Sequence, residues 1–292
     1  MKKICIIVNP VAGRRILKRT GRAHCELEKR GAQVDRKTTR GPGDATSLAE
    51  QAVAQNYDVI VAAGGDGTVN EVMNGMAHSA VPLALLPFGT TNLFAREIGL
   101  HRRPGKAVDT ILNGRRQKVN LGRAGDRYFL LMAGIGFDAH VVHNLNLRLK
   151  SIVGELAYIF SALSLITKTP PRKCIEARIN GETPMKCSSL ILGNAKYYGG
   201  SFEVTPGATI TKPNLELCAF AGETRRSIVK YALGILLKKH THFASVTTRT
   251  VESLAVDSEI PVHVQVDGDY LCQLPLEFKV VPEALTILRP RN

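Results

Sequence analysis

The sequence contains no tryptophan, and only 5% of its 292 residues are aromatic. Proteins that bind single-stranded nucleic acid commonly stack bases on aromatic side chains, so this scarcity argues against that class. Acidic residues are also few: 25 Asp and Glu stand against 39 Lys and Arg, which gives a formal net charge of +14. A basic surplus of this size suits phosphorylated ligands and anionic membranes as well as nucleic acid.

Long hydrophobic runs are missing as well. The apolar run Ile4–Val8 is too short for a signal peptide and stops at Asn9-Pro10. Residues 72–95 carry no Lys, Arg, Asp or Glu, but Pro82 and Pro87 interrupt them, which argues against a membrane span. We therefore expect a cytoplasmic protein without a secretion signal or a membrane-spanning helix.

Several motifs of other enzyme classes are absent. The six cysteines include no C-x-x-C pair, so we expect reduced thiols and neither a disulfide framework nor a zinc site. His140 and His143 lie at i, i+3 but lack a Cys or acid at zinc spacing. No G-x-x-x-x-G-K-[ST] occurs, which excludes a P-loop, and no G-x-S-x-G occurs, which excludes the nucleophile elbow of α/β-hydrolases.

The charges that are present alternate along the chain. Residues 1–40 hold twelve Lys or Arg against three acids, and residues 101–127 hold eight against two. Residues 41–100 hold one Arg against six acids, and residues 251–281 hold one Lys against six acids. Nucleic-acid-binding proteins more often show an uninterrupted basic stripe. The alternation suits a site for a metal-bound phosphate, although a solvated basic surface would give a similar pattern.

The first 120 residues predict an α/β domain. Short buried strands alternate with helical stretches, the pattern of a doubly wound parallel sheet. The expected strands are Ile4–Val8, Val34–Thr38, Val59–Ala63 and Leu83–Leu86, and the expected helices are 15–30, 45–55, 68–77, 92–98 and 104–112.

The pattern changes near residue 120. Strands such as Ile175–Ile179, Val262–Val266 and Leu276–Val280 alternate polar and apolar residues, which predicts an antiparallel β-sandwich. The run Tyr128–Ala133 also predicts a strand. Two helical stretches, about 144–167 and 224–239, interrupt these strands. We therefore expect an α/β domain over residues 1–122 and a β-rich domain over residues 123–292, whose C-terminal tail can return to the first domain.

The strongest local signal is the run Gly64-Gly65-Asp66-Gly67-Thr68, directly after a predicted strand. Glycines there let backbone N–H groups approach an anion, and the following helix points its positive end at the same place. Ligands bind at this edge of open α/β sheets. An acid among such amides suggests that Asp66 holds Mg²⁺ on a nucleotide. A Gly-rich turn with Asp as a helix cap is the structural alternative.

Two further turns repeat this arrangement. Residues Pro87–Asn92 follow the next strand, and Asn9–Arg15 follow the first. Because parallel strands end at one edge of a sheet, we expect the turns at Gly64–Thr68 and Pro87–Asn92 to lie side by side there. Thr91 or Asn92 would alternatively be an ordinary helix cap. The cation of Arg14 or Arg15 suits a phosphate.

The chain resembles the soluble diacylglycerol kinase catalytic-domain family, the bacterial lipid kinases related to sphingosine and ceramide kinases. The resemblance is carried, in family order, by Asn9-Pro10-x-Ala12-Gly13, Gly64–Gly75, Leu86–Arg96, Gly134-Ile-Gly-Phe-Asp138 and Val266-Asp-Gly-Asp269. NAD kinases and phosphofructokinases share the Gly-Gly-Asp-Gly-Thr core, so the extension through Glu71 and Gly75 is what favours lipid kinases.

The resemblance implies an ATP-binding domain of NAD kinase/diacylglycerol kinase type, a C-terminal sandwich domain, and Mg²⁺ with the ATP. It also implies that Asp269 is the base that accepts the proton of a lipid hydroxyl, with Asp267 beside it and Asp66 near the phosphates. Asp267-Gly268 is at the same time the usual signal of a two-residue hairpin turn. The residues expected at the nucleotide are Asn9, Arg14, Thr39, Gly64, Gly65, Asp66, Gly67, Thr68, Asn70, Glu71, Gly89 and Thr90.

Three acids of the family pattern are replaced in this sequence. Leu93, Asn120 and the pair Pro213-Asn214 stand where many bacterial members carry Asp. Those acids belong to a structural Mg²⁺ network in some relatives, so we do not expect a dedicated structural metal here.

The sequence therefore predicts an ATP-dependent lipid kinase that acts on a diacylglycerol-like lipid at an anionic membrane, peripheral to its inner face. No nucleic-acid partner is expected, and a homodimer stays open. The apolar stretches 152–166 and 228–237 have basic ends, which suits either a membrane surface or packing on the sandwich core. The alternatives are an NAD kinase and a non-catalytic regulator that binds nucleotide or lipid.

Overall fold

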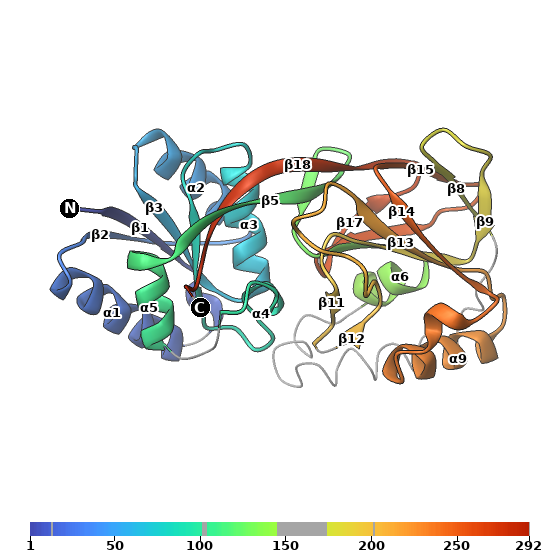
Figure 1. The fold of residues 1–292 in the computed structure, drawn as a ribbon, viewed down its shortest axis with the longest axis horizontal. Helices are drawn as coiled ribbons and strands as arrows, with labels where there is room; N and C mark the ends of the chain where they lie inside the picture. Colours follow the sequence, from blue (N-terminus) through green and yellow to red (C-terminus); the bar gives the residue numbers. More distant parts are fainter. Residues whose placement is uncertain (13, 101–103, 145–173, 201, 292) are drawn as a thin grey trace. The chain divides into compact units, whose positions relative to one another are not determined.

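A computed structural model describes the chain except for residues 13, 101–103, 145–173, 201 and 292 (Figure 1). It divides into two compact units: Met1–Leu121 with Pro282–Asn292, and Gly122–Val281. We call them unit 1 and unit 2. The helix expected over about 144–167, and with it the apolar stretch 152–166, lies outside the described residues.

Unit 1 contains a parallel sheet in the order β2-β1-β3-β4. The two central strands are almost continuously apolar and buried, as strands covered on both faces must be. The four strands predicted from the sequence are confirmed. They are β1 (Lys3–Val8), β2 (Gln33–Thr38), β3 (Val59–Gly64) and β4 (Leu83–Pro87).

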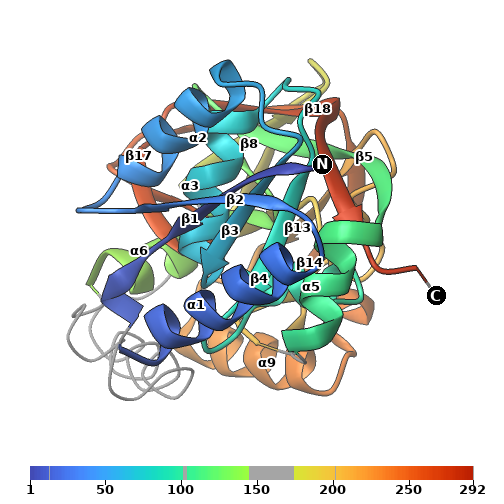
Figure 2. The same ribbon diagram turned by 90° about the vertical axis from the view of Figure 1, so that its left-hand side faces the viewer.

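Helices cover both faces of this sheet. In Figure 2, α2 and α3 lie above the strands, and α1 and α5 lie below them. The close approach of α2 to α3 explains Gly75, since a Cβ there would collide with the carbonyl oxygen of Thr46. The bounds are α1 (Arg14–Lys29), α2 (Asp44–Ala54), α3 (Asp66–Met76), α4 (Leu93–Glu97) and α5 (Pro104–Asn113), with a 3₁₀ turn η1 (Pro10–Ala12) before α1.

The last strand, β18 (Leu276–Arg289), begins in unit 2 and ends in unit 1. The sequence predicted only its first five residues. Its second half buries Leu285 and Ile287, and it adds a strand to the parallel sheet through the pairing of Ile287 with Leu83. Strand β5 (Arg115–Ala124) pairs with it. The C-terminal segment is therefore part of the core of unit 1.

Unit 2 is a sandwich of antiparallel sheets, as the sequence predicts. One sheet has the order β14-β13-β10-β7-β16-β17, and the other contains the start of β18 with β15, β8 and β9. Inward side chains of both sheets form one core that includes Phe129, Ile175, Leu217 and Phe278. The strands are β6 (Arg127–Phe129), β7 (Met132–Ile135), β8 (Ile175–Ile179), β9 (Met185–Cys187), β10 (Ser189–Gly193), β11 (Tyr197–Tyr198), β12 (Phe202–Glu203), β13 (Leu215–Phe220), β14 (Val246–Val251), β15 (Ser253–Ser258), β16 (His263–Val266) and β17 (Asp269–Gln273).

Two helices and a 3₁₀ turn complete the described part of unit 2. They are α6 (Phe137–Asn144), α9 (Arg225–Leu236) and η2 (His240–His242). The helix predicted over 224–239 is confirmed as α9. Every helix among the described residues is too short or too polar to cross a membrane.

Two expectations about element bounds are wrong. Tyr128–Ala133 is not one strand but the end of β6, a break and the start of β7. The break arises because the amides of Leu130, Leu131 and Met132 all donate to the carboxylate of Asp267. Helix α3 begins at Asp66 rather than at residue 68, so Asp66 lies in the first helical turn.

Candidate functional site

The carboxyl ends of the parallel strands in unit 1 form one edge. The register places Val8 beside Thr38 and Ala63, and Ala63 beside Leu86. Backbone hydrogen bonds continue past the strands: the amide of Thr39 donates to Val8, that of Asn9 donates to Ala63, and that of Phe88 donates to Gly64. The turns that follow β1, β3 and β4 therefore lie side by side, which confirms the prediction for the turns after β3 and β4.

The Gly64–Thr68 run is built to expose backbone amides. Gly64 ends β3, and Gly65 is the N-cap of α3, with no side chain to satisfy the first amides of the helix. Intrahelical bonding begins with the Val69 amide, which donates to the carbonyl of Gly65 at 3.1 Å. A Cβ on Gly64 would collide with the Thr68 side chain, whereas open space surrounds the Gly67 Cα. The first-turn amides thus form a potential anion site.

The Asp66 carboxylate joins the turn after β3 to the turn after β4. One oxygen accepts a hydrogen bond from the Thr91 hydroxyl at 2.8 Å, and the other accepts one from the Phe94 amide at 3.2 Å. Asp66 therefore caps the start of α4 from the neighbouring helix. Each of its oxygens keeps a second lone pair, and the role of Asp66 toward Mg²⁺ stays a prediction.

The turn after β4 is held by Asn92, whose backbone is left-handed (φ 52°). Its side-chain oxygen accepts from the Gly89 amide at 3.0 Å, and its amide group donates to the Gly89 carbonyl at 2.7 Å. A Cβ on Gly89 would collide with the Cα of Gly65. Gly89 is therefore needed so that the two turns can touch backbone to backbone.

The other predicted nucleotide residues have varied surroundings. Asn9 accepts the Val11 amide at 3.0 Å and so closes its own turn, and Arg14 is the first residue of α1. Thr39 is buried beside the end of β1, and Thr90 is exposed in the turn after β4.

Asn70 and Glu71 lie on α3. Asn70 is buried and accepts from Asn74, while Glu71 accepts the Ala45 amide of α2 at 3.2 Å. Their nucleotide contacts stay predictions.

One cation at this edge was not predicted. The Arg19 guanidinium of α1 lies over the Phe88 ring, 4.3 Å from the ring centroid. Phe88 belongs to the turn after β4, so this cation–π contact holds a positive charge beside the three turns. Arg19 follows Arg15 by four residues on a helix, a spacing that could have drawn attention to it.

In unit 2, Asp267 and Gly268 form the hairpin turn between β16 and β17. Both have positive φ, 49° and 87°, and Val266 pairs with Asp269 across them. This is the geometry of a type I′ turn, as the Asp-Gly signal predicts. The Asp267 carboxylate accepts three amides, from Leu130 at 2.8 Å and from Leu131 and Met132 at 2.9 Å each. Asp267 thus anchors the turn, and its catalytic role stays a prediction.

Asp269 is the first residue of β17 and is exposed. No interaction of its carboxylate with another described side chain is found. The turn that carries it is braced twice, by Asp267 and by the Gly268 amide, which donates to the side-chain oxygen of Gln265 at 2.8 Å. The backbone therefore presents the Asp269 carboxylate to solvent from a fixed position.

A buried polar chain, not predicted from the sequence, continues from this turn. The Gln265 amide group donates to Asp138 at 2.6 Å, and the Tyr198 hydroxyl also donates to Asp138. A Cβ on Gly134 would occupy the space of the Asp138 and Gln265 side chains. The Gly134-Ile-Gly-Phe-Asp138 motif thus supports the turn that carries Asp269. The spacing of its glycines in the sequence does not reveal this role.

A cluster of rings includes Tyr270, the residue that follows Asp269 in β17. His143 of α6 stacks on His263 of β16 at 4.3 Å between centroids and contacts the Tyr270 ring at 4.6 Å, and His140 stacks on His263 at 5.5 Å. Burial lowers the pKa of His140, and the neighbouring His143 lowers it further. Burial first, and then His143 and His140, lower the pKa of His263. Both shifts favour the neutral imidazoles of His140 and His263.

The structure gives the surroundings of the residues that replace the three acids. Leu93 is buried in unit 1, and the buried Asn120 accepts the Glu283 amide at 2.9 Å. Pro213 and Asn214 lie in the turn before β13. Among the described residues, no group of three or more His, Cys, Asp or Glu side chains could hold a metal ion.

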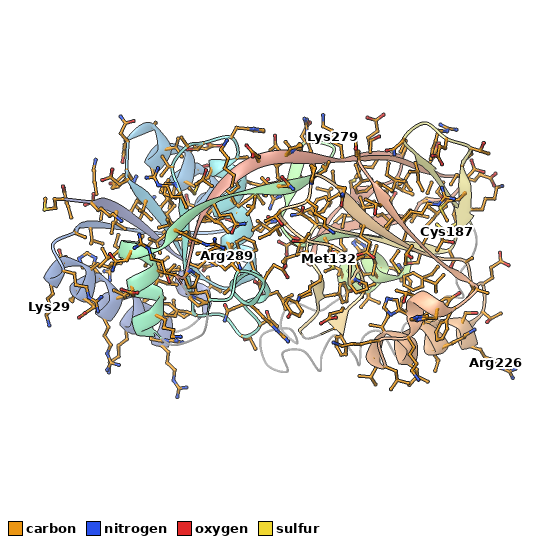
Figure 3. All side chains as sticks on the ribbon, in the orientation of Figure 1. Lys29, Met132, Cys187, Arg226, Lys279 and Arg289 are labelled. Carbon is orange, nitrogen blue, oxygen red and sulfur yellow. The ribbon has the colours of Figure 1, made fainter. Side chains whose placement is uncertain are left out.

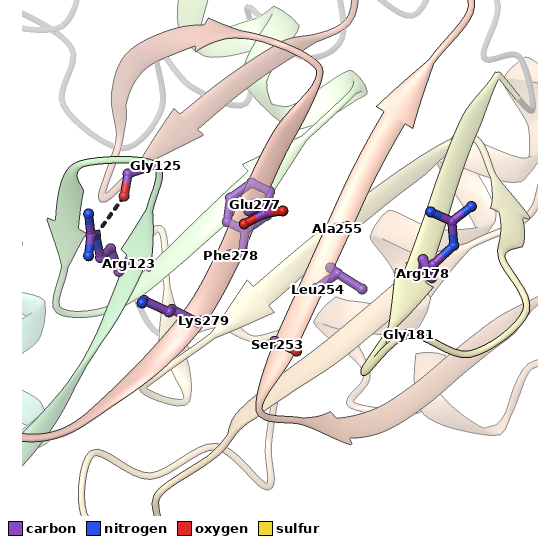
Figure 4. A pocket seen from close by; sticks show the side chains of 10 residues that line it. All are labelled: Arg123, Gly125, Arg178, Gly181, Ser253, Leu254, Ala255, Glu277, Phe278 and Lys279. Atoms are coloured by element: carbon purple, nitrogen blue, oxygen red, sulfur yellow. Dashed lines mark hydrogen bonds between the residues drawn. The ribbon is translucent and has the colours of Figure 1, made fainter.

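A hollow of about 370 Å³ lies on the outer face of the unit 2 sheet formed by β5, β18, β15 and β8. Figure 4 shows Arg123 and Lys279 at one end and Arg178 at the other, with Glu277 between them. Arg123 donates to the Gly125 carbonyl at 2.7 Å and pairs with Asp126. Because its charges are mixed and partly paired, the hollow adds no residue to the candidate site.

Two family models match the chain. The diacylglycerol kinase catalytic domain matches residues 3–124, and the YegS C-terminal NAD kinase beta sandwich-like domain matches residues 132–289. The first match contains all three turns of unit 1, and the second contains Asp138, Asp267 and Asp269.

Curated relatives match over the whole length. A diacylglycerol kinase of Staphylococcus saprophyticus is 30% identical over 297 residues, which cover 100% of this chain and 96% of that protein. A diacylglycerol kinase of Bacillus subtilis is 29% identical over 297 residues and is covered to 98%. The crystal structure of a diacylglycerol kinase of Bacillus anthracis superposes with a TM-score of 0.78 at 23% identity, covering 99% of this chain and 97% of that one, so the fold is shared. The chain belongs to the diacylglycerol kinase catalytic domain family.

Proposed function

We propose that this protein is an ATP-dependent lipid kinase, which transfers the γ-phosphate of ATP to the hydroxyl group of a diacylglycerol-like lipid. The observation that carries the proposal is the edge of unit 1, where an uncapped helix start and two glycine-containing turns converge. The full-length similarity to proteins named diacylglycerol kinase supports the lipid as acceptor.

The nucleotide half of the reaction falls to the turns of unit 1. Phosphoryl transfer needs mainly positioning and neutralisation of phosphate charge. The first-turn amides of α3, at Asp66, Gly67 and Thr68, donate to phosphate oxygens, and the helix dipole adds a partial positive charge. Open space at Gly67 leaves room for the phosphates to reach these amides, and Arg19 adds a nearby cation.

The same edge fits a magnesium ion that arrives with ATP. Mg²⁺ is commonly bound by substrate phosphates, water and only one or two protein carboxylates. Asp66 is the carboxylate of this chain that would hold it, through the lone pairs that Thr91 and Phe94 leave free. When bound, the ion neutralises charge that develops on the transferred phosphate.

The acceptor half falls to Asp269. A carboxylate within hydrogen-bonding reach of the lipid hydroxyl takes its proton as the oxygen attacks phosphorus. Asp269 suits this role because its turn is fixed by Asp267 and Gln265, while its own carboxylate faces solvent. Asp267 acts as a positioning residue through its three amide contacts.

Transfer of label from γ-labelled ATP tests this proposal. The purified protein is incubated with labelled ATP and Mg²⁺, either with a total lipid extract or with NAD, and the products are separated and identified. We expect label in a lipid carrying a new phosphomonoester and none in NAD. Label in phosphorylated NAD alone would identify an NAD kinase. ATP binding without any transfer of label would identify a non-catalytic regulator. Either result would overturn the proposal.

A further inference from the structure

Helix α9 (Arg225–Leu236) is held by only one of its faces. Thr224 caps its start and accepts the Ser227 amide at 3.2 Å, and Tyr231 and Gly234 are its buried residues. The Tyr231 ring packs on Phe220 of β13 with centroids 4.9 Å apart. Gly234 allows close packing against Phe243 and His240. The buried face is therefore narrow and lies on the Tyr231 side.

The opposite face exposes an apolar strip. Val229, Leu233, Leu236 and Leu237 are 45%, 53%, 59% and 63% exposed. Their spacing of i, i+4, i+7 and i+8 places them on one side of the helix. Large apolar side chains as exposed as these are few in the described part of the chain, and four of them gather here. A clustered apolar strip, unlike a single exposed leucine, marks a surface that binds something.

Cations frame this strip. Arg225, Arg226, Lys230 and Lys239 are all exposed, and Figure 3 shows Arg226 projecting away from the ribbon. Lys230 lies over the Phe243 ring at 4.7 Å, and Lys238 pairs with Glu203 at 3.1 Å. No ion pair is found for the arginines among the described residues. The strip thus combines apolar insertion with unneutralised positive charge.

We propose that α9 is a docking helix for an anionic lipid bilayer. A short helix with leucines on one face and basic residues at the flanks lies in the membrane interface. Its 12 residues are too few to span a bilayer. A second copy of the chain is a poorer occupant, because two such strips face to face would bring the cations of both together. This inference rests on the proposed function, since a lipid kinase must meet its substrate at a membrane.

Tryptophan fluorescence tests the docking directly, because the chain has no tryptophan of its own. Leu236→Trp places a single reporter on the strip. Ile260→Trp is the matched control, since Ile260 is 41% exposed in the same unit next to the acidic Glu259. With vesicles of phosphatidylglycerol and phosphatidylcholine, we expect a blue shift and a rise in emission for Leu236→Trp only. An unchanged Leu236→Trp spectrum would overturn the proposal.

Vesicle sedimentation measures the strength of binding. The double variant Leu233→Ser/Leu236→Ser should bind anionic vesicles about a hundredfold more weakly, the loss expected when two leucines no longer insert. Arg225→Gln/Arg226→Gln should lose about thirtyfold on anionic vesicles and little on neutral ones. Ile260→Ser should bind like the parent protein. Equal binding by all variants, or dimerisation through the strip without vesicles, would contradict the assignment.

Activity separates this inference from the proposed kinase function. The leucine double variant should phosphorylate a water-soluble short-chain diacylglycerol at the parent rate, but should lose about tenfold or more on the same lipid in vesicles. If no lipid is phosphorylated at all, the kinase proposal fails while the fluorescence and sedimentation results still decide the docking. Equal losses on both substrates would contradict a docking role for α9.

Discussion

Substitution of Asp267 tests how the hairpin turn that carries Asp269 is held in place. Its carboxylate accepts three consecutive amides at 2.8–2.9 Å, from the two residues between β6 and β7 and from the first residue of β7. A hydrogen bond to a charged group contributes about 1.5–3 kcal/mol, and losing a shared acceptor is less than additive. Asp267→Ala should therefore lower the free energy of unfolding by about 3–5 kcal/mol. Asp267→Asn keeps one acceptor oxygen and tolerates the left-handed backbone, so it should cost about 1–2 kcal/mol.

Urea unfolding followed by circular dichroism measures these differences. Asp269→Asn, two residues away on the same hairpin, is the matched control and should change stability by less than about 0.5 kcal/mol, as exposed substitutions usually do. If Asp267→Ala unfolded within 0.5 kcal/mol of the parent, the three contacts would not anchor the turn. If Asp269→Asn were as destabilising as Asp267→Ala, the separation of a positioning from a reacting carboxylate would be refuted.

Three further predictions concern other parts of the molecule. Gly89→Ala should lower the free energy of unfolding by about 1–3 kcal/mol and weaken ATP binding, because its Cβ meets the Gly65 Cα. Gly41→Ala, which has open space around its Cβ, should leave both quantities unchanged. Thermal unfolding and nucleotide titration measure them. Because the pKa values of His140 and His263 are lowered in the folded chain, the unfolded chain binds more protons than the folded one as the pH falls through 6.5. The free energy of unfolding should therefore decrease below that pH, and it should decrease less in the variant His140→Asn/His263→Asn. Of the thiols, the exposed Cys25 should react first with a disulfide reagent, while Cys5, Cys187 and Cys218, whose pKa values burial raises to about 11, 12 and 12, should react only on unfolding.

The parallel strands and the edge of unit 1 could be predicted from the sequence because each signal is local. A buried apolar run such as Val59–Gly64 followed by glycines specifies a strand, a turn and a helix start without reference to distant residues. The Asp267-Gly268 turn was predicted for the same reason, since positive φ at two successive positions demands these residue types.

Other features depend on partners far away in the chain. The second half of β18 is a strand because it pairs with β4, about 200 residues earlier, and its own residues alternate poorly. The break between β6 and β7 exists because Asp267 captures amides that a ladder would otherwise use. Likewise, the contacts of Asp66 with Thr91 and Phe94 join two motifs that the sequence shows only separately.

The apolar strip of α9 is an intermediate case. Its leucines and cations were visible in the sequence, but the same pattern suits a helix packed on the sandwich with its cations reaching solvent. Only the structure separates the two, because it buries Tyr231 and Gly234 and leaves Leu233 and Leu236 exposed.

The most direct test of the account is phosphoryl transfer by Asp269→Asn beside its control Asp257→Asn, an exposed acid of β15. Both are assayed with γ-labelled ATP and diacylglycerol in vesicles, and ATP affinity is measured separately by titration. Loss of a general base lowers rates by about 10²–10⁴-fold. We predict a loss of that size for Asp269→Asn with unchanged ATP affinity, and the parent rate for Asp257→Asn. Transfer by Asp269→Asn at the parent rate would contradict the assignment of Asp269 as the base of a lipid kinase.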